Sequence, residues 1–228
     1  MIGTTSRVFC PHCSRESEPG EFCSSCGRVL PVLSQESYYL VMGDENEFLK
    51  LDLADLEKRF FELSKKFHPD RFATKSALEL QISHDRSSAV NNAYRILRDP
   101  VARAKYMVER ELGSIEEKSS KVPVEMSDLF FEVHESLDLI RESEGDPPEH
   151  AVAEVQKAEE ELVQKVKELE EQLQEKFLEY DRGRERQTIE QIKEILSQRS
   201  YIKSFLRQVD GVLRREEDSS QRPQRSQR

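Results

Sequence analysis

The chain has 228 residues, a net charge of −10 and a charged fraction of 35%, with 8 glycines and no tryptophan. This length allows one or two domains, and the composition favours long solvent-exposed helices over a large sheet-based enzyme. A strongly negative chain is a poor general scaffold for nucleic acid, because phosphate binding requires clustered positive charge. No run of about 18 apolar residues occurs, and the N-terminus carries no export or organelle signal. We therefore expect a cytoplasmic protein that binds neither membrane nor nucleic acid.

All four cysteines lie near the N-terminus, in two Cys-x-x-Cys pairs: Cys10, Cys13, Cys23 and Cys26. In a reducing compartment they argue against a disulfide framework. Each pair can hold one edge of a metal ion, and two pairs complete a tetrahedral thiolate site. We predict that residues 1–35 form a four-cysteine knob around a structural zinc ion and fold only with it. The alternatives are reduced structural cysteines, a redox-active pair, or His12 as a ligand, although His12 is expected to face solvent.

Residues 36–113 predict a compact helical unit. A short apolar helix begins at Tyr38, and Asp52 suits the N-cap of a helix over residues 53–67. That helix carries an apolar stripe at helical spacing: Leu56, Phe60, Leu63 and Phe67. A second helix is expected over residues 76–97 and a third over 101–112. The predicted inward face of the second helix consists mainly of Leu78, Ile82, Ala89, Ala93 and Leu97.

The tripeptide His68-Pro69-Asp70 separates the first two long helices. Pro69 lacks an N–H group and disfavours helical backbone at His68, so the preceding helix must end near Phe67. One imidazole and one carboxylate are then displayed on a bend, next to a helix with four basic residues: Lys58, Arg59, Lys65 and Lys66. This arrangement indicates a surface that another protein binds. A solvated turn histidine and a local aspartate cap are the alternative interpretation.

The C-terminal half predicts a three-helix bundle over residues 124–213. Its helices, over 124–141, 149–180 and 188–213, carry apolar stripes and are separated by short breaks. A coiled-coil homodimer through the longest helix is an alternative, but the flanking helices give its stripe partners in the same chain. Residues 114–123 are expected to be a linker and residues 214–228 a disordered tail. The predicted fold class is therefore all-α, preceded by the small four-cysteine knob.

Residues 38–112 resemble a J domain. The resemblance rests on the basic helix, the His68-Pro69-Asp70 bend, Asn91-Asn92-Ala93-Tyr94 with Leu97, and Asp99-Pro100 with Arg103-Ala104-Tyr106. The last group, following the Tyr38-Tyr39-Leu40 start, is similar to HscB, the J-type co-chaperone of iron–sulfur cluster assembly. HscB proteins have a C-terminal helical bundle instead of a Gly/Phe-rich linker. A four-cysteine knob before the J domain resembles the eukaryotic and some bacterial members. In architecture, the resemblance covers residues 36–213.

The resemblance implies a regulator of another protein's ATPase rather than an enzyme. Asp70 and the basic helix would dock on the ATP-bound form of a DnaK/HscA-class chaperone, while His68 and Pro69 hold the loop in shape. The client would be the scaffold protein that carries the nascent iron–sulfur cluster.

The resemblance also implies a scaffold-binding patch on the first and last bundle helices, at Met126, Leu129, Phe130, Phe131 and Tyr201. Ser127 and Asp128 depart from the apolar residues expected there. Because consecutive helical residues point about 100° apart, Leu129, Phe130 and Phe131 cannot all face one core. At least one is expected to be exposed, and the alternative is that these aromatics belong to the bundle core.

Three other functions compete with this interpretation. A general J protein for other clients is disfavoured because the sequence lacks a Gly/Phe-rich linker and a peptide-binding β-domain. A zinc-ribbon adaptor for RNA or a transcription complex is disfavoured by the net charge of −10. A redox enzyme would require a βαβ context around Cys10 and Cys13, and none is visible.

Overall fold

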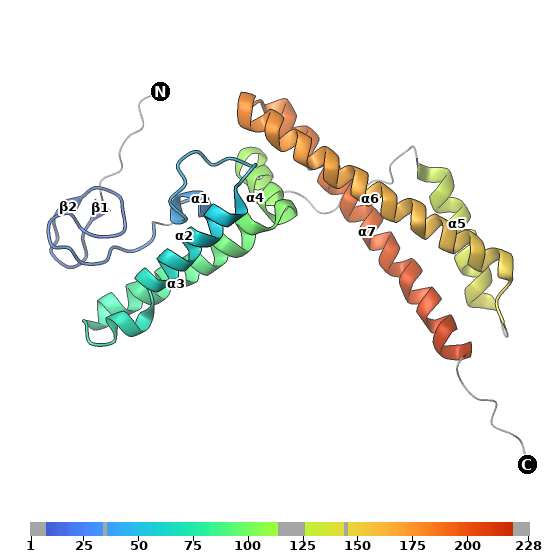
Figure 1. Ribbon diagram of the computed structural model, residues 1–228, viewed down its shortest axis with the longest axis horizontal. Coiled ribbons are helices and arrows are strands. Elements are labelled where there is room, and N and C mark those ends of the chain that lie inside the picture. Colours follow the sequence, from blue (N-terminus) through green and yellow to red (C-terminus); the bar gives the residue numbers. More distant parts are fainter. Residues whose placement is uncertain (1–7, 34–35, 114–125, 144–145, 221–228) are drawn as a thin grey trace, which may run out of the picture. The chain divides into compact units, whose positions relative to one another are not determined.

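The computed structural model describes residues 8–33, 36–113, 126–143 and 146–220. The chain divides into two compact units, Met1–Tyr106 and Met107–Arg228. The predicted all-α fold class is confirmed: in the described parts of the chain, the regular elements are helices apart from a small N-terminal sheet (Figure 1). The expected linker over 114–123 lies outside the described residues, and the domain limits given above stay predictions.

The four-cysteine knob, residues 8–33, consists of two short hairpins. In the first, β1 (Val8–Phe9) pairs antiparallel with β2 (Glu16–Ser17). In the second, Phe22 and Val29 form an isolated antiparallel bridge. These strands were not predicted from the sequence, because a two-residue strand is too short to show alternation.

The first unit then continues as a helical hairpin with short flanking helices, labelled in Figure 1. Its elements are α1 (Tyr38–Val41), α2 (Leu53–Lys66), the 3-10 turn η1 (Pro69–Phe72), α3 (Ala77–Arg98) and the first half of α4 (Pro100–Leu112), which continues into the second unit. As predicted, Asp52 caps α2, because its side chain accepts hydrogen bonds from the backbone N–H groups of Ala54 and Asp55. Ser76 and Glu79 form a capping box at the start of α3.

The predicted inward face of α3 is wrong at its first position. Leu78 is 44% exposed, while Glu79 and Val90 are buried. Glu79 occupies the inward position because the Ser76 hydroxyl group donates a hydrogen bond to its carboxylate, which lowers the pKa of Glu79. Leu78 lies about 100° away around the helix and therefore points outward.

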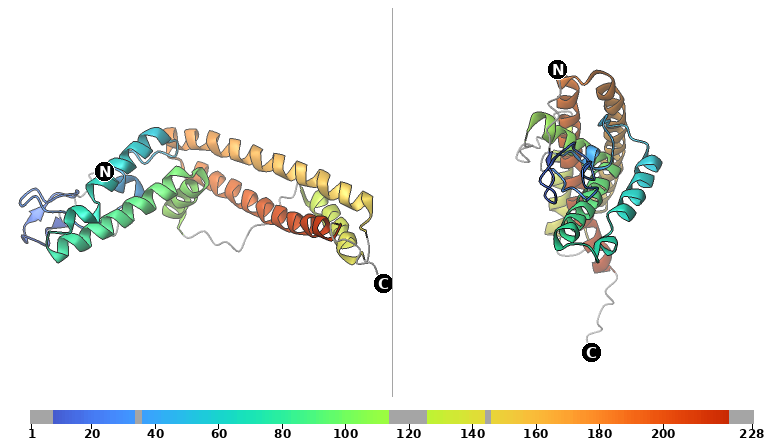
Figure 2. Two further views of the ribbon diagram at one scale, coloured as in Figure 1. Left: turned by 60° about the horizontal axis from the view of Figure 1, so that its bottom comes forward. Right: turned by 90° about the vertical axis from the view of Figure 1, so that its left-hand side faces the viewer.

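The second unit contains the predicted three-helix bundle: α5 (Ser127–Glu142), α6 (Glu149–Gly183) and α7 (Arg186–Ser220). The helices α6 and α7 run side by side, and α5 packs against both (Figure 2). The apolar stripe of α6, from Val155 to Tyr180, is buried within the chain, so the bundle accounts for the repeat that a coiled coil would also use. The helix α7 continues through residues 214–220, which were expected to be disordered; Arg and Glu there are good helix formers, and Pro223 is the next breaker.

None of the helices in the described parts of the chain is both long and apolar enough to cross a membrane.

A carboxylate pair joins α6 and α7. Burial raises the pKa of Glu159, and a hydrogen bond with Asp210 and the charges of Asp210 and Glu160 raise it further. The folded state therefore retains a proton on Glu159 at pH values where the unfolded chain has released it.

We expect the bundle to lose stability as the pH rises from the unfolded pKa of about 4.5 through the raised folded pKa of Glu159. Glu159→Gln keeps the hydrogen bond but removes the charge, so the stability of this variant should depend less on pH in this range. The measurement is the thermal unfolding midpoint of both proteins between about pH 4 and pH 7. Parallel profiles in this range would contradict the assignment, and Glu171→Gln, an exposed change on the same helix that does not contribute to the pKa of Glu159, is the control.

Candidate functional site

The bend His68–Asp70, called the HPD loop from here on, follows directly from the end of α2. The backbone of His68 is extended (φ −60°, ψ 128°), and Pro69 begins η1, as expected for a proline at the first helical position. The backbone N–H of Asp70 donates a hydrogen bond to Nδ1 of His68 over 3.3 Å. His68 thus acts as the N-cap of η1 and fixes the direction of the next two residues.

Both polar side chains of the HPD loop face solvent. The side chain of Asp70 is 89% exposed and that of His68 is 57% exposed, with 3.5 Å between Nδ1 and the carboxylate. The carboxylate accepts no hydrogen bond from the described residues that would neutralise it. The geometry leaves it available to a partner, and its role in docking stays a prediction.

Two hydrogen bonds hold the residues that flank the HPD loop. The buried Ser83 hydroxyl group on α3 donates to the carbonyl oxygen of Phe67, the residue before the loop, over 3.2 Å. Arg71, the residue after it, donates to the carbonyl oxygen of Lys65 over 3.3 Å. These two contacts tie the loop's ends to α3 and α2, so the displayed groups sit on a fixed frame.

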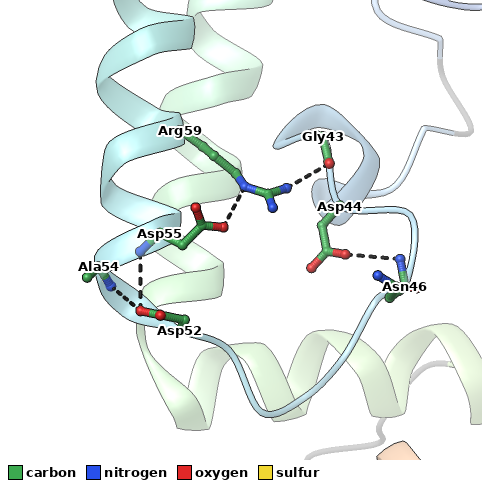
Figure 3. A network of polar contacts seen from close by, with 7 residues as sticks. All are labelled: Gly43, Asp44, Asn46, Asp52, Ala54, Asp55 and Arg59. Atoms are coloured by element: carbon green, nitrogen blue, oxygen red, sulfur yellow. Dashed lines mark hydrogen bonds and ion pairs between the residues drawn. The ribbon is translucent and has the colours of Figure 1, made fainter.

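The four basic residues predicted beside the loop divide into two pairs. Arg59 is engaged within the protein, because its guanidinium binds the Asp55 carboxylate over 2.8 Å and the carbonyl oxygen of Gly43 over 2.7 Å (Figure 3). Lys66 forms an ion pair with Glu21 of the four-cysteine knob. Arg59 and Lys66 are seven residues apart and lie on one face of α2, occupied by the protein's own acceptors.

Lys58 and Lys65 lie on the neighbouring face of α2 and are both exposed. Neither forms an ion pair within the described ranges of the chain. Phe61 lies between them on the same face and is 62% exposed. We call Lys58, Phe61 and Lys65 the α2 stripe; Phe61 lies outside the apolar stripe predicted for this helix, and its exposure was not predicted from the sequence.

The four cysteines meet in one cluster, the four-cysteine site. All four sulfur atoms lie within 4.8 Å of one another. The sulfur atoms of Cys10 and Cys26 are 3.6 Å apart and those of Cys13 and Cys23 are 3.8 Å apart. A tetrahedron with metal–sulfur distances of about 2.3 Å has edges of about 3.8 Å, so the cluster fits one four-coordinate metal ion and no disulfide.

The two Cys-x-x-Cys turns have the same backbone design. The residue after each pair has a positive φ, 57° at Ser14 and 69° at Gly27, and donates its N–H group to the carbonyl oxygen of the first cysteine. This left-handed residue closes the turn and brings the paired sulfur atoms together. His12 is half-buried and lies 3.2 Å from the carbonyl oxygen of Val29, so it braces the knob instead of facing solvent as predicted.

Ionisation is unevenly distributed over the cluster. Burial raises the pKa of Cys23, but hydrogen bonds from the backbone at Cys26 and Ser25 outweigh it and lower the pKa to about 6. A backbone contact at Arg28 lowers the pKa of Cys26, yet burial and the neighbouring sulfur atoms raise it to about 12. Four thiolates this close repel one another, and a divalent cation is the group that lets all of them ionise.

The expected scaffold-binding residues divide into buried and exposed members. Phe130 is 3% exposed and contacts the rings of Tyr201 and Phe205 edge-on, at centroid distances of 5.0 and 4.6 Å. Met126 is buried, Leu129 and Tyr201 are half-buried, and Phe131 is 76% exposed. At least one aromatic residue is therefore exposed, as the helical geometry predicted.

The contact between the four-cysteine knob and α3 was not predicted from the sequence. The buried side chain of Arg86 bonds to backbone carbonyl groups of the knob. No local sequence signal could reveal this contact, because its partners are more than 50 residues away and contribute only main-chain atoms.

A helical hairpin with the HPD loop at its bend, followed by a C-terminal three-helix bundle, is the architecture predicted for a J domain with an appended bundle. The predicted resemblance to HscB co-chaperones is confirmed by curated relatives, although no family model matches the chain. This chain is 38% identical over 96 residues to "Co-chaperone protein HscB homolog" of Haemophilus ducreyi, and the match covers 41% of this chain and 56% of that protein. It is 33% identical over 102 residues to "Iron-sulfur cluster co-chaperone protein HscB" of Mus musculus, covering 44% and 43%.

Solved structures agree in fold. The crystal structure of human HscB matches 89% of this chain and 97% of its own, with a TM-score of 0.59 and 24% identity. HscB from Vibrio cholerae matches 79% of this chain and 99% of its own, with a TM-score of 0.54 and 20% identity. The two curated sequence matches span only about half of each relative, so activity and partners are a matter for proposal.

Proposed function

We propose that the chain is a co-chaperone that stimulates the ATPase of a DnaK/HscA-class chaperone and delivers an iron–sulfur cluster scaffold protein to it. The observation that carries this proposal is the exposed HPD loop, fixed at the end of α2 next to the α2 stripe. The names of the similar HscB proteins, co-chaperones of iron–sulfur clusters, support it.

The docking chemistry follows from the exposed groups. The Asp70 carboxylate can accept charge-assisted hydrogen bonds from a cationic side chain of the chaperone. Lys58 and Lys65 would attract an acidic surface of the chaperone, which speeds the encounter of the two proteins and fixes their relative orientation. If the loop binds the hydrolysis-competent state of the chaperone more tightly, docking shifts the population toward that state. The residues of this chain thus bind and orient a partner, and the proposed role is regulation of its ATPase and not catalysis.

The scaffold protein would bind the patch on α5 and α7, with Phe131 as its most exposed apolar group. An exposed phenylalanine next to a packed aromatic cluster is typical of a binding hot spot, since the cluster holds the backbone rigid. Met126, Leu129, Phe130 and Tyr201 would support or border this contact.

We propose zinc as the ion of the four-cysteine site. Four sulfur ligands leave no open coordination position, so the ion would stabilise the knob without activating a substrate. The free thiols fit a reducing compartment, and we propose the cytoplasm.

The test is single-turnover ATP hydrolysis by a purified DnaK-class chaperone with the full chain, with and without an iron–sulfur cluster scaffold protein. We expect stimulation by the chain alone and a further increase with the scaffold. Stimulation that is indifferent to the scaffold would favour a general J protein for other clients. No stimulation would refute the co-chaperone proposal.

Phe61→Ala is expected to weaken binding to the ATP-bound chaperone about tenfold, because an exposed aromatic group at the centre of a charged interface is a typical hot spot. Its stability should hardly change, since the ring is 62% exposed. Affinity is measured by titration with the labelled chaperone, with Phe131→Ala, a similarly exposed aromatic change in the bundle, as control. Equal affinities of wild type and Phe61→Ala would exclude Phe61 from the docking surface.

A further inference from the structure

One buried cation fastens the four-cysteine knob to the helical hairpin. Arg86 on α3 is only 5% exposed. Its guanidinium donates hydrogen bonds to the carbonyl oxygens of Leu30, of Gly20 over 2.8 Å and of Pro31 over 3.2 Å. Burial lowers the pKa of Arg86, so the charged side chain depends on these acceptors to remain inside the protein.

The three acceptors lie on the two arms of the second knob hairpin. The arms are joined by the Phe22–Val29 bridge and by a hydrogen bond of 2.9 Å from the Leu30 N–H to the Glu21 carbonyl oxygen. Cys23 and Cys26 are at its tip. Since the knob has little apolar core apart from its cysteines, Val29 and Leu30, a bound ion would supply much of the closure of this hairpin. Arg86 therefore has its full acceptor set only while the hairpin is closed.

The same hairpin touches the residue that precedes the HPD loop. The ring of Phe22 stacks on that of Phe67 at a centroid distance of 5.9 Å, and the Arg86 guanidinium lies 5.1 Å from the Phe67 centroid. Phe67 is 1% exposed, with α3 binding its carbonyl oxygen and the knob covering its ring. His68 is the next residue, so the position of Phe67 sets where the loop begins.

We infer that Arg86 is a positioning residue that couples metal binding at the four-cysteine site to the order of the HPD loop. With the ion bound, the knob holds Arg86 and Phe67, and the loop keeps the shape that docks. When the ion is lost the hairpin opens, the contacts to both residues weaken, and the last turn of α2 and the loop become mobile. The consequence for docking rests on the proposed function, whereas the structural coupling does not.

Loss of the ion would also release Lys66 from its ion pair with Glu21, which adds positive charge to the face of α2 next to the α2 stripe. The two side chains are 42% and 35% exposed, and an ion pair at such exposure contributes little. A disordered loop, in contrast, must be ordered again at each docking event. The loss of order in the loop therefore outweighs the added charge, and we expect docking to weaken when the metal is lost.

The experiment compares hydrogen exchange in three full-length proteins: wild type, Arg86→Met, and the control Arg95→Met, which changes an exposed arginine on the same helix. Each is measured with Zn²⁺ and after removal of Zn²⁺ by a chelator, and Co²⁺ absorption reports whether the four-cysteine site still binds metal. In wild type, metal removal should speed exchange of residues 63–73 about tenfold, the factor for losing one charged hydrogen bond. Exchange in α6 should stay constant.

Arg86→Met should bind Co²⁺ and yet exchange fast over residues 63–73 with Zn²⁺ present, while Arg95→Met should behave like wild type. Unchanged exchange over 63–73 after metal removal, or in metal-bound Arg86→Met, would overturn the coupling. Chaperone affinity of the same samples separates the two proposals. Coupled exchange without any chaperone binding would refute the proposed function alone, whereas equal binding and equal exchange with and without metal would refute the coupling alone.

Discussion

Replacing His68 by glutamine is expected to lower stimulation of the chaperone's ATPase about tenfold or to background, while the free energy of unfolding stays nearly constant. The imidazole is 57% exposed, so its loss opens no cavity. Its Nδ1 accepts the hydrogen bond from the Asp70 N–H group, which starts η1 and aims the carboxylate. Glutamine is longer and caps poorly, so the loop loses its shape. Single-turnover ATP hydrolysis and thermal unfolding of both proteins measure the two effects.

Asp70→Asn separates the shape of the loop from its charge. Asparagine keeps the size of the side chain, but it removes the negative charge that a cationic partner group would bind. We expect the same loss of stimulation as in His68→Gln, whereas Asp138→Asn, an exposed change on α5, should act like wild type. Full stimulation by both loop variants would show that the chaperone docks elsewhere.

Much of the helical fold follows from local sequence signals. Apolar residues at helical spacing, Asp52 as a cap and Pro69 as a breaker placed the ends of α2 within one residue of those observed. The inward face of α3 was harder to predict, because a capping box took Glu79 to the buried position and left Leu78 outside. Competition between a cap and an apolar stripe is a tertiary outcome that periodicity alone does not resolve.

The residues of the candidate sites could be named from the sequence, but which of them already bind other groups of the protein could not. The spacing of the cysteines predicted the four-cysteine site, and the tripeptide His68-Pro69-Asp70 predicted the HPD loop. The sequence did not reveal that Arg59 and Lys66 are occupied, while Lys58 and Lys65 form no ion pair with any described residue. The seven-residue spacing within each pair was a usable signal, since it places each pair on its own face of α2. The partners of the occupied pair depend on tertiary contacts.

Phe130→Ala is expected to destabilise the bundle by about 3–5 kcal/mol, the usual range for removing a buried phenylalanine. The ring is 3% exposed and packs edge-on against Tyr201 and Phe205, so its loss leaves a cavity between α5 and α7. Chemical denaturation of the full chain, followed by helical circular dichroism, measures the change. A loss below about 1 kcal/mol would mean that the bundle collapses into the space.

Phe131→Ala is the matched change one residue further along α5. Its ring is 76% exposed, so stability should fall by less than about 0.5 kcal/mol, while affinity for the scaffold protein should drop about tenfold. Because the two substitutions remove the same group from adjacent positions, a difference between them can only reflect the direction in which each ring points. Unchanged scaffold affinity in Phe131→Ala would move the client surface away from this face of α5, and the aromatic cluster around Phe130 would then serve the bundle core alone.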